Sequence, residues 1–211
     1  MMVEPQWIRW AKRIQAIAQT GLSFARDPYD LDRYRELREL ATDMLAHGAG
    51  LDGSPDRLRV RELFAGESGY PTPKVDVRAA VFQESRVLMV KERSDGRWSI
   101  PGGWADVGSS PGEMAVREVY EESGYRVRPV RILAVWDNSR HHDRPVAYAV
   151  YKICIGCELV GGESRAGTET EAVGWFSLDA LPELSVTRIT EQQLRRLHEL
   201  HTHPQLGPDF D

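Results

Sequence analysis

The chain has 211 residues, 41% of them hydrophobic and 28% charged, with a formal net charge of −5. That length and composition suit one globular domain with a small appendage. The acidic balance disfavours a dedicated nucleic-acid or membrane binder. No apolar run is long enough to cross a bilayer, and the first residues lack the apolar core of a signal peptide. We therefore expect a soluble, cytoplasmic protein.

Two amphipathic helices are predicted at the start of the chain. Apolar residues recur at intervals of three and four from Trp7 to Ala18 and again from Leu31 to Leu45, with Gly21 and Gly48 as stop signals. A hairpin of two such helices cannot bury both apolar stripes by itself. It must pack on the rest of the chain or on a second copy. We expect a homodimer formed through these helices.

The composition shifts to Gly, Pro, Ser and charged residues between Gly48 and Pro73. We place the domain boundary there, with a helical N-terminal extension over 1–70 and a second domain over 71–211. In the second domain, strand patterns are predicted over 74–82, 86–93, 127–137 and 147–159, with a shorter one from 173 and a closing helix over 189–203. Strands on both sides of one central helix predict an α/β fold with a mixed sheet between helices.

The stretch from Pro101 to Tyr125 carries the candidate chemistry. A glycine-containing turn leads into a run with helical spacing, and Glu118, Glu121 and Glu122 share one face of that helix. Adjacent carboxylates repel one another, and Mg²⁺ or Mn²⁺ among them would offset that repulsion. The alternative is a solvated acidic face on a surface helix. A hard cation at this place suits water attack on a phosphoanhydride.

This stretch resembles the signature of the Nudix hydrolases. That signature is a Gly, five residues, a Glu, seven residues, and then Arg-Glu-aliphatic-x-Glu-Glu-x-Gly-aliphatic. The matching residues are Gly103, Arg117, Glu118, Val119, Glu121, Glu122 and Gly124. The resemblance implies an α/β/α sandwich and divalent-metal hydrolysis of a nucleoside diphosphate linked to another group.

The resemblance also implies roles for individual residues. Glu118, Glu121 and Glu122 correspond to the metal ligands, and the carbonyl of Gly103 corresponds to a further ligand. Arg117 corresponds to the arginine that holds a carboxylate in position.

The chain departs from the signature at two positions, because Ser109 replaces the early Glu and Tyr125 replaces the last aliphatic residue. Without that Glu, Arg117 needs another partner. Either Asp106 or Glu113 takes its place, or the site is weakened and the protein binds nucleotides without much turnover. We expect an active enzyme, since the three other glutamates are present.

The N-terminal helices resemble the extension of one Nudix branch, which is associated with CDP-choline and ADP-ribose pyrophosphatase activity and with dimers. The expected reaction releases a nucleoside monophosphate. Two alternatives stay open. One is a pyrophosphohydrolase acting on nucleoside triphosphates or RNA 5′ ends, and the acidic balance disfavours binding of RNA. The other is a nucleotide-sensing binding protein.

Residues outside the signature are candidates for proton transfer and substrate contact. Glu169 is our choice for the general base or an extra metal ligand, with Glu171 second; the alternative is a solvated acidic loop. Four residues are candidate contacts for phosphate or base, with surface ion pairs and core packing as the alternatives. They are Arg78, Arg93, Trp98 and Trp136.

Overall fold

A computed structural model gives the fold and describes residues 4–48, 55–142 and 148–211. It divides into two compact units, Met1–Pro73 with Asp143–Ala149, and Lys74–His142 with Val150–Asp211. Expectations for residues 1–3, 49–54 and 143–147, including the start of the strand predicted over 147–159, lie outside the described residues. None of the described helices is both long and apolar enough to span a membrane.

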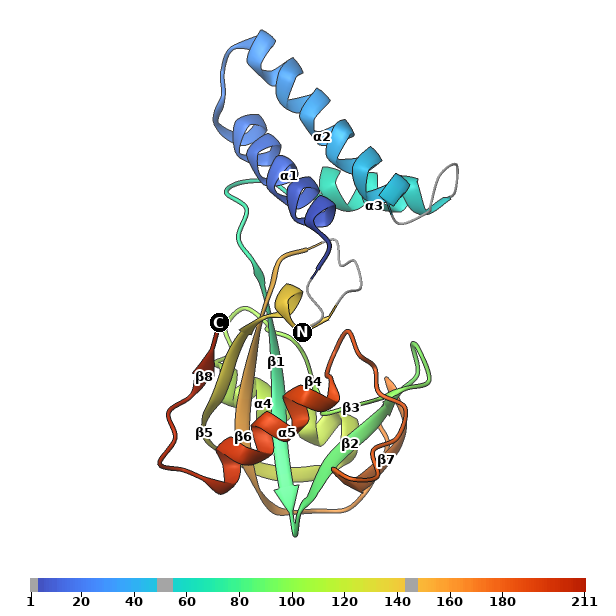
Figure 1. Cartoon of the computed structure of the whole chain (residues 1–211), viewed down its shortest axis with the longest axis vertical. Coiled ribbons are helices and arrows are strands. Elements are labelled where there is room, and N and C mark those ends of the chain that lie inside the picture. Colours follow the sequence, from blue (N-terminus) through green and yellow to red (C-terminus); the bar gives the residue numbers. More distant parts are fainter. Residues whose placement is uncertain (1–3, 49–54, 143–147) are drawn as a thin grey trace. The chain divides into compact units, whose positions relative to one another are not determined.

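The first unit contains helices α1 (Gln6–Phe24), α2 (Pro28–Gly48) and α3 (Pro55–Ala65) (Figure 1). Its buried core contains five apolar side chains from the three helices: Ile8, Ala11, Ala41, Leu45 and Phe64. The two predicted helices are present, but Gly21 does not end α1. A Cβ atom at Gly21 would lie 2.3 Å from the ring of Tyr34. This glycine therefore allows α1 and α2 to approach closely.

The second unit is built on one mixed sheet. Its strands run in the order β3-β2-β1-β6-β5-β8, with β4 paired to β1 and β7 paired to β2. β1 is parallel to β6 and antiparallel to β2. The strands are β1 (Lys74–Gln83), β2 (Arg86–Glu92), β3 (Trp98–Ser99), β4 (Gly102–Trp104), β5 (Tyr125–Asp137), β6 (Val150–Gly162), β7 (Thr170–Ser177) and β8 (Asp209–Phe210).

Two helices cover opposite faces of this sheet (Figure 1). Helix α4 (Pro111–Ser123) packs on the face that carries Val77, Ala79 and Val81 of β1. Helix α5 (Glu191–Thr202) packs on the other face, where Ala80 of β1 lies. The alternation along β1 therefore sends successive side chains into two cores. A short 3₁₀ helix, Asn138–Arg140, follows β5. The predicted mixed sheet between helices is confirmed.

Strand β4 was not expected, because the sequence around the paired glycines indicates only a loop. Gly102 pairs with Arg78 of β1, and a Cβ atom at Gly102 would lie 2.1 Å from the carbonyl oxygen of Val77. Gly102 also has a φ of 145°, which residues with side chains rarely adopt. The glycine lets β4 lie directly against β1, and this places the turn beside α4.

Candidate active site

Helix α4 has well-defined ends. The Ser110 side chain and Glu113 form a reciprocal capping box at its start, and Gly124 closes it with φ 74°. One face of the helix, with Met114, Ala115 and Val119, is buried in the sheet core. That packing fixes the rotation of the helix and therefore the direction of its glutamates.

The three glutamates differ in burial. Glu122 is only 7% exposed, Glu118 is half-buried and Glu121 is exposed. The backbone N–H of Gly102 donates a 3.0 Å hydrogen bond to Oε2 of Glu122. A Cβ atom at Gly103 would lie 3.4 Å from Oε2 of Glu118. Strand β4 and two of the predicted ligands are therefore in direct contact.

Burial governs the protonation of these carboxyl groups. Burial raises the pKa of Glu122 to about 8, against the attraction of Arg78 and the hydrogen bond from Gly102, while Glu92 and Glu118 raise it further. Burial also raises the pKa of Glu118, and the negative charge of Glu121 adds to this rise. The surrounding protein therefore only partly compensates the negative charge of these groups in their ionised form, and the protonated form is favoured.

The residues fit a divalent cation by the chemistry of their donors. Carboxylate oxygens are the ligands that Mg²⁺ and Mn²⁺ prefer, and a cation would offset the repulsion that raises these pKa values. Within the described residues, however, no group of three or more His, Cys, Asp or Glu side chains is arranged to hold a metal. Binding of one cation by all three glutamates would therefore require side-chain rotation.

Arg117 has a carboxylate partner, although Ser109 stands where the signature has its early Glu. Its guanidinium forms an ion pair with Asp106, and it also contacts the sulfur of Met114. Glu113 is engaged in the capping box with Ser110 instead. Of the two candidates, Asp106 is therefore the one that the structure pairs with Arg117.

Arg78 is a buried counter-ion. It is 5% exposed, and its Nε lies 3.0 and 3.1 Å from the two carboxylate oxygens of Asp76. It also donates to the carbonyl oxygen of Ile100 at 3.3 Å. These contacts leave little of its guanidinium for a phosphate, contrary to the expected phosphate clamp, because β4 and the turn before it cover this part of β1.

Arg93 contacts the loop that carries Glu169. Its backbone N–H donates to the carbonyl oxygen of Glu169 at 2.9 Å, and its Nε donates to the carbonyl oxygen of Thr168 at 2.9 Å. The charge of Glu169 raises the pKa of Glu118, so this carboxylate lies within electrostatic range of α4. Glu171, the second choice for the base, forms an ion pair of 3.0 Å with Lys91.

The two tryptophans belong to the core. Trp136 is 2% exposed, and Trp98 stacks edge-to-face on Phe176 with ring centroids 4.6 Å apart. Both pack in the cluster under α5. Their rings are occupied by protein contacts, contrary to the expected stacking on a base, because each side chain points into the hydrophobic core.

A buried charged network lies nearby, and the sequence analysis did not single it out. Glu92 is 5% exposed and lies 3.3 Å from Nε of Arg188. Lys152 is 1% exposed, donates to the carbonyl oxygen of Arg188, and lies 3.9 Å from Asp76. Burial lowers the pKa of Lys152 to about 8. In the sequence, Lys152 lies in the middle of an apolar stretch, and this feature could have indicated the buried network.

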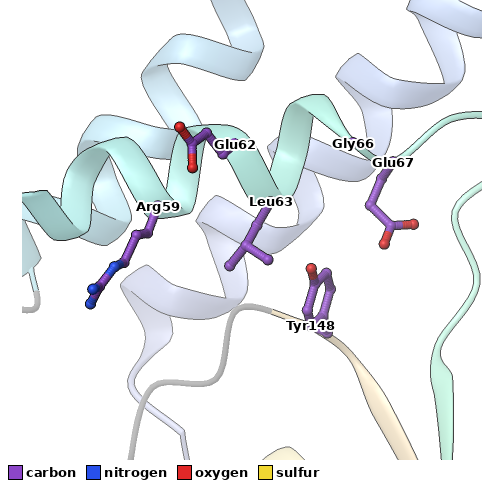
Figure 2. Close-up of a pocket in the computed structure, with 6 residues that line it drawn as sticks. All are labelled: Arg59, Glu62, Leu63, Gly66, Glu67 and Tyr148. Carbon is purple, nitrogen blue, oxygen red and sulfur yellow. The ribbon is translucent and has the colours of Figure 1, made fainter.

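Each unit also contains an open hollow. One, of about 600 Å³, lies at the C-terminal end of α4, where the guanidinium of Arg165 sits 5.6 Å from the ring centroid of Tyr120. Another, of about 500 Å³, lies in the first unit (Figure 2). It is lined by Arg59, Glu62, Leu63, Gly66, Glu67 and Tyr148. Neither hollow includes the glutamates of α4 in its lining.

Comparison with known proteins places this geometry in context. The NUDIX domain profile matches residues 72–197, and the profile of a UDP-X-like, N-terminal oligomerisation domain matches residues 5–64. The Bacillus subtilis (strain 168) protein YjhB, provisionally named an ADP-ribose pyrophosphatase, is 45% identical over 210 residues, covering 99% of each chain.

Two solved structures extend the comparison. An ADP-ribose pyrophosphatase from Streptococcus suis 89-1591 is 43% identical, with a TM-score of 0.61, and the match covers 66% of this chain and 100% of that one. A UDP-X diphosphatase is 32% identical, with a TM-score of 0.63, and the match covers 100% of both chains.

Proposed function

The chain belongs to the Nudix hydrolases and is a pyrophosphohydrolase; from this premise we propose that it cleaves the pyrophosphate of a nucleoside diphosphate linked to another group, of the ADP-ribose class, with release of a nucleoside monophosphate. The observation that supports the proposal is the placement of Glu118 and Glu122 against the turn of β4. Two desolvated carboxylates beside a backbone turn suit a cation that bridges phosphate oxygens.

The names of the similar proteins support this substrate class. Two of them carry the ADP-ribose pyrophosphatase name and one is a UDP-X diphosphatase, and the last matches along its whole length. The N-terminal profile is likewise described as UDP-X-like. All these names share a nucleoside diphosphate joined to a second group. CDP-choline has the same linkage, so it stays among the candidate substrates.

We assign separate roles in the reaction to the residues of this site. Glu118, Glu121, Glu122 and the carbonyl of Gly103 would hold Mg²⁺ or Mn²⁺, which would neutralise the phosphates and lower the pKa of a water. Glu169 accepts the proton of the attacking water.

Two further contacts hold the site in shape. The hydrogen bond from Gly102 holds Glu122 toward β4. The pair between Arg117 and Asp106 joins α4 to the loop that precedes it.

We also propose that the first unit forms the homodimer. Trp10, Ile17 and Phe24 recur at intervals of seven along α1 and are 52%, 55% and 64% exposed. A stripe of large apolar side chains left open in the monomer is typical of a helix that packs on a partner. The oligomerisation profile over residues 5–64 supports a second copy as that partner.

A hydrolysis panel tests the proposed activity. It contains ADP-ribose, UDP-linked sugars, CDP-choline, nucleoside triphosphates and 5′-triphosphorylated RNA, each with Mg²⁺, Mn²⁺ or chelator. We expect metal-dependent release of a nucleoside monophosphate from one or more of the diphosphate-linked compounds. Release of pyrophosphate from triphosphates or RNA alone would replace the proposed substrate class. Nucleotide binding without turnover of any compound would favour a binding protein.

A further inference from the structure

The loop between β6 and β7 lies tightly against the C-terminal end of α4. The backbone N–H of Arg165 donates to the carbonyl oxygen of Ser123 at 2.9 Å. A Cβ atom at Gly124 would lie 2.4 Å from the carbonyl oxygen of Glu163. A Cβ atom at Gly167 would lie 2.1 Å from the carbonyl oxygen of Glu121. Loop and helix end are therefore in backbone contact, which only glycine permits at these two positions.

Thr170 connects the two main chains at this place. It is the first residue of β7 and is fully buried. Its hydroxyl donates to the carbonyl oxygen of Glu122 at 2.8 Å and accepts from the backbone N–H of Gly167 at 2.7 Å. One hydroxyl group thus satisfies a carbonyl at the end of α4 and an amide in the loop.

Arg93 holds the same loop from the other side. Its two hydrogen bonds reach the carbonyl oxygens of Thr168 and Glu169, each at 2.9 Å. Thr170 itself pairs with Glu92 of β2, beside a register shift between Lys91 and Glu92. The main chain of Glu169 is therefore fixed between β2 and α4, although its side chain is exposed to solvent.

We propose that Thr170 is a positioning residue that sets the Glu169 carboxylate against the glutamates of α4, with no contact of its own to the substrate. This inference rests on the proposed function, in which Glu169 accepts the proton of the attacking water. A misplacement of about 1 Å in a reacting group can cost on the order of 100-fold in rate. A hydroxyl that joins the backbones of Glu122 and Gly167 prevents such a displacement.

A double-mutant cycle tests whether Thr170 acts through Glu169. Thr170→Val keeps the shape of the side chain and removes both hydrogen bonds, whereas Thr170→Ser keeps the hydroxyl. We expect Thr170→Val to lower kcat by about 10- to 100-fold with KM nearly unchanged, and Thr170→Ser to restore most of it. In the Glu169→Gln background, Thr170→Val should cause little further loss. Multiplicative losses, or an effect mainly on KM, would overturn the inference.

The matched control is Thr42→Val in the first unit. Thr42 is also fully buried, and its hydroxyl donates to the carbonyl oxygen of Arg38 at 3.0 Å. The Thr42→Val variant removes a buried threonine hydroxyl that is far along the chain from α4, so kcat should stay at the wild-type value. A loss equal to that of Thr170→Val would mean that any buried threonine hydroxyl has this effect.

Hydrogen exchange gives a readout that does not depend on activity. Thr170→Val should speed amide exchange in the peptide that spans residues 163–169, and Thr170→Ser should not. Unchanged exchange in Thr170→Val would overturn the positioning role even if the wild-type enzyme is active. Inactivity of the wild type on every compound of the panel would instead overturn the proposed function. The catalytic part of this inference would then fall with it, while faster exchange would still support the structural link.

Discussion

The two units differ in what the isolated chain leaves unpaired: exposed apolar surface in the first unit and a buried carboxyl group in the second. The first unit exposes large apolar side chains along α1, at Trp10, Ile17 and Phe24. The second unit encloses the carboxyl group of Glu122, which is 7% exposed. Exposed apolar area is stabilised when another apolar surface buries it, whereas a buried negative charge is stabilised when a cation neutralises it. This difference agrees with the proposed partners, which are a second copy of the chain for the first unit and a divalent metal for the second.

The largest effect is expected at the buried carboxylate. Glu122→Gln keeps the shape and the hydrogen bond from Gly102 but removes the negative charge. We expect kcat/KM to fall by about 100- to 1,000-fold, as when one group that stabilises transition-state charge is removed. Glu113→Gln is the matched control, because a glutamine also completes a capping box and Glu113 lies in none of the proposed metal contacts. Equal activity of both variants would remove Glu122 from the site.

The next effect concerns the apolar stripe of α1. The double variant Trp10→Asp with Phe24→Asp should weaken self-association by at least about 100-fold. Losing an aromatic hot spot at an interface costs roughly 2–4 kcal/mol. Mass in solution across a concentration series gives the answer. Phe210→Asp is the control, because Phe210 is 80% exposed and lies in β8 of the second unit. A wild-type chain that is monomeric at all concentrations would contradict the dimer.

The buried lysine allows a test by pH. Burial lowers the pKa of Lys152 from 10.5 to about 8. Between these values the unfolded chain binds more protons at this residue than the folded chain, so its contribution to stability rises with pH. Relative to Lys152→Met, the wild type should gain on the order of 3 kcal/mol between pH 8 and pH 10.5. Urea unfolding of both proteins measures the difference, and a difference independent of pH would show that Lys152 is not desolvated.

The smallest effect is expected at the departure from the signature. Ser109→Glu restores the usual carboxylate, yet Arg117 is already paired with Asp106. We therefore expect kcat/KM to change by less than about threefold, and Asp106→Asn to cost no more than about 1 kcal/mol of stability, since this ion pair is largely exposed. A tenfold gain in kcat/KM from Ser109→Glu would show that Asp106 does not replace the missing carboxylate.

The features that could be predicted from the sequence are those with local signals. Helix α4 has a capping serine, a periodic apolar face and a closing Gly124, and its glutamates fall at fixed spacing. Helices α1 and α2 have clear apolar stripes. Gly21 shows the limit of such signals, because it reads as a stop but serves a close helix contact with Tyr34. Whether a glycine ends a helix or admits a neighbour depends on packing.

The contacts that could not be predicted join residues far apart in the chain. The hydroxyl of Thr170 meets the carbonyl oxygen of Glu122, and Arg93 meets the loop carbonyl oxygens of Thr168 and Glu169. These contacts to main-chain carbonyl oxygens cannot be predicted from composition or periodicity. The burial of Arg78 was also missed, because it depends on contacts with Asp76, with the carbonyl oxygen of Ile100 and with Gly102 of the three-residue strand β4.

We propose above all that the carboxylates of α4 hold a catalytic metal. The most direct measurement is a Mn²⁺ titration followed by the spin-resonance signal of free Mn²⁺, made on the wild type and on Glu122→Gln, with ADP-ribose hydrolysis assayed in the same samples. We expect the wild type to remove Mn²⁺ from solution as activity appears, and Glu122→Gln to lose both Mn²⁺ binding and activity. Hydrolysis that persists in chelator, or equal Mn²⁺ binding and activity by the two proteins, would contradict it.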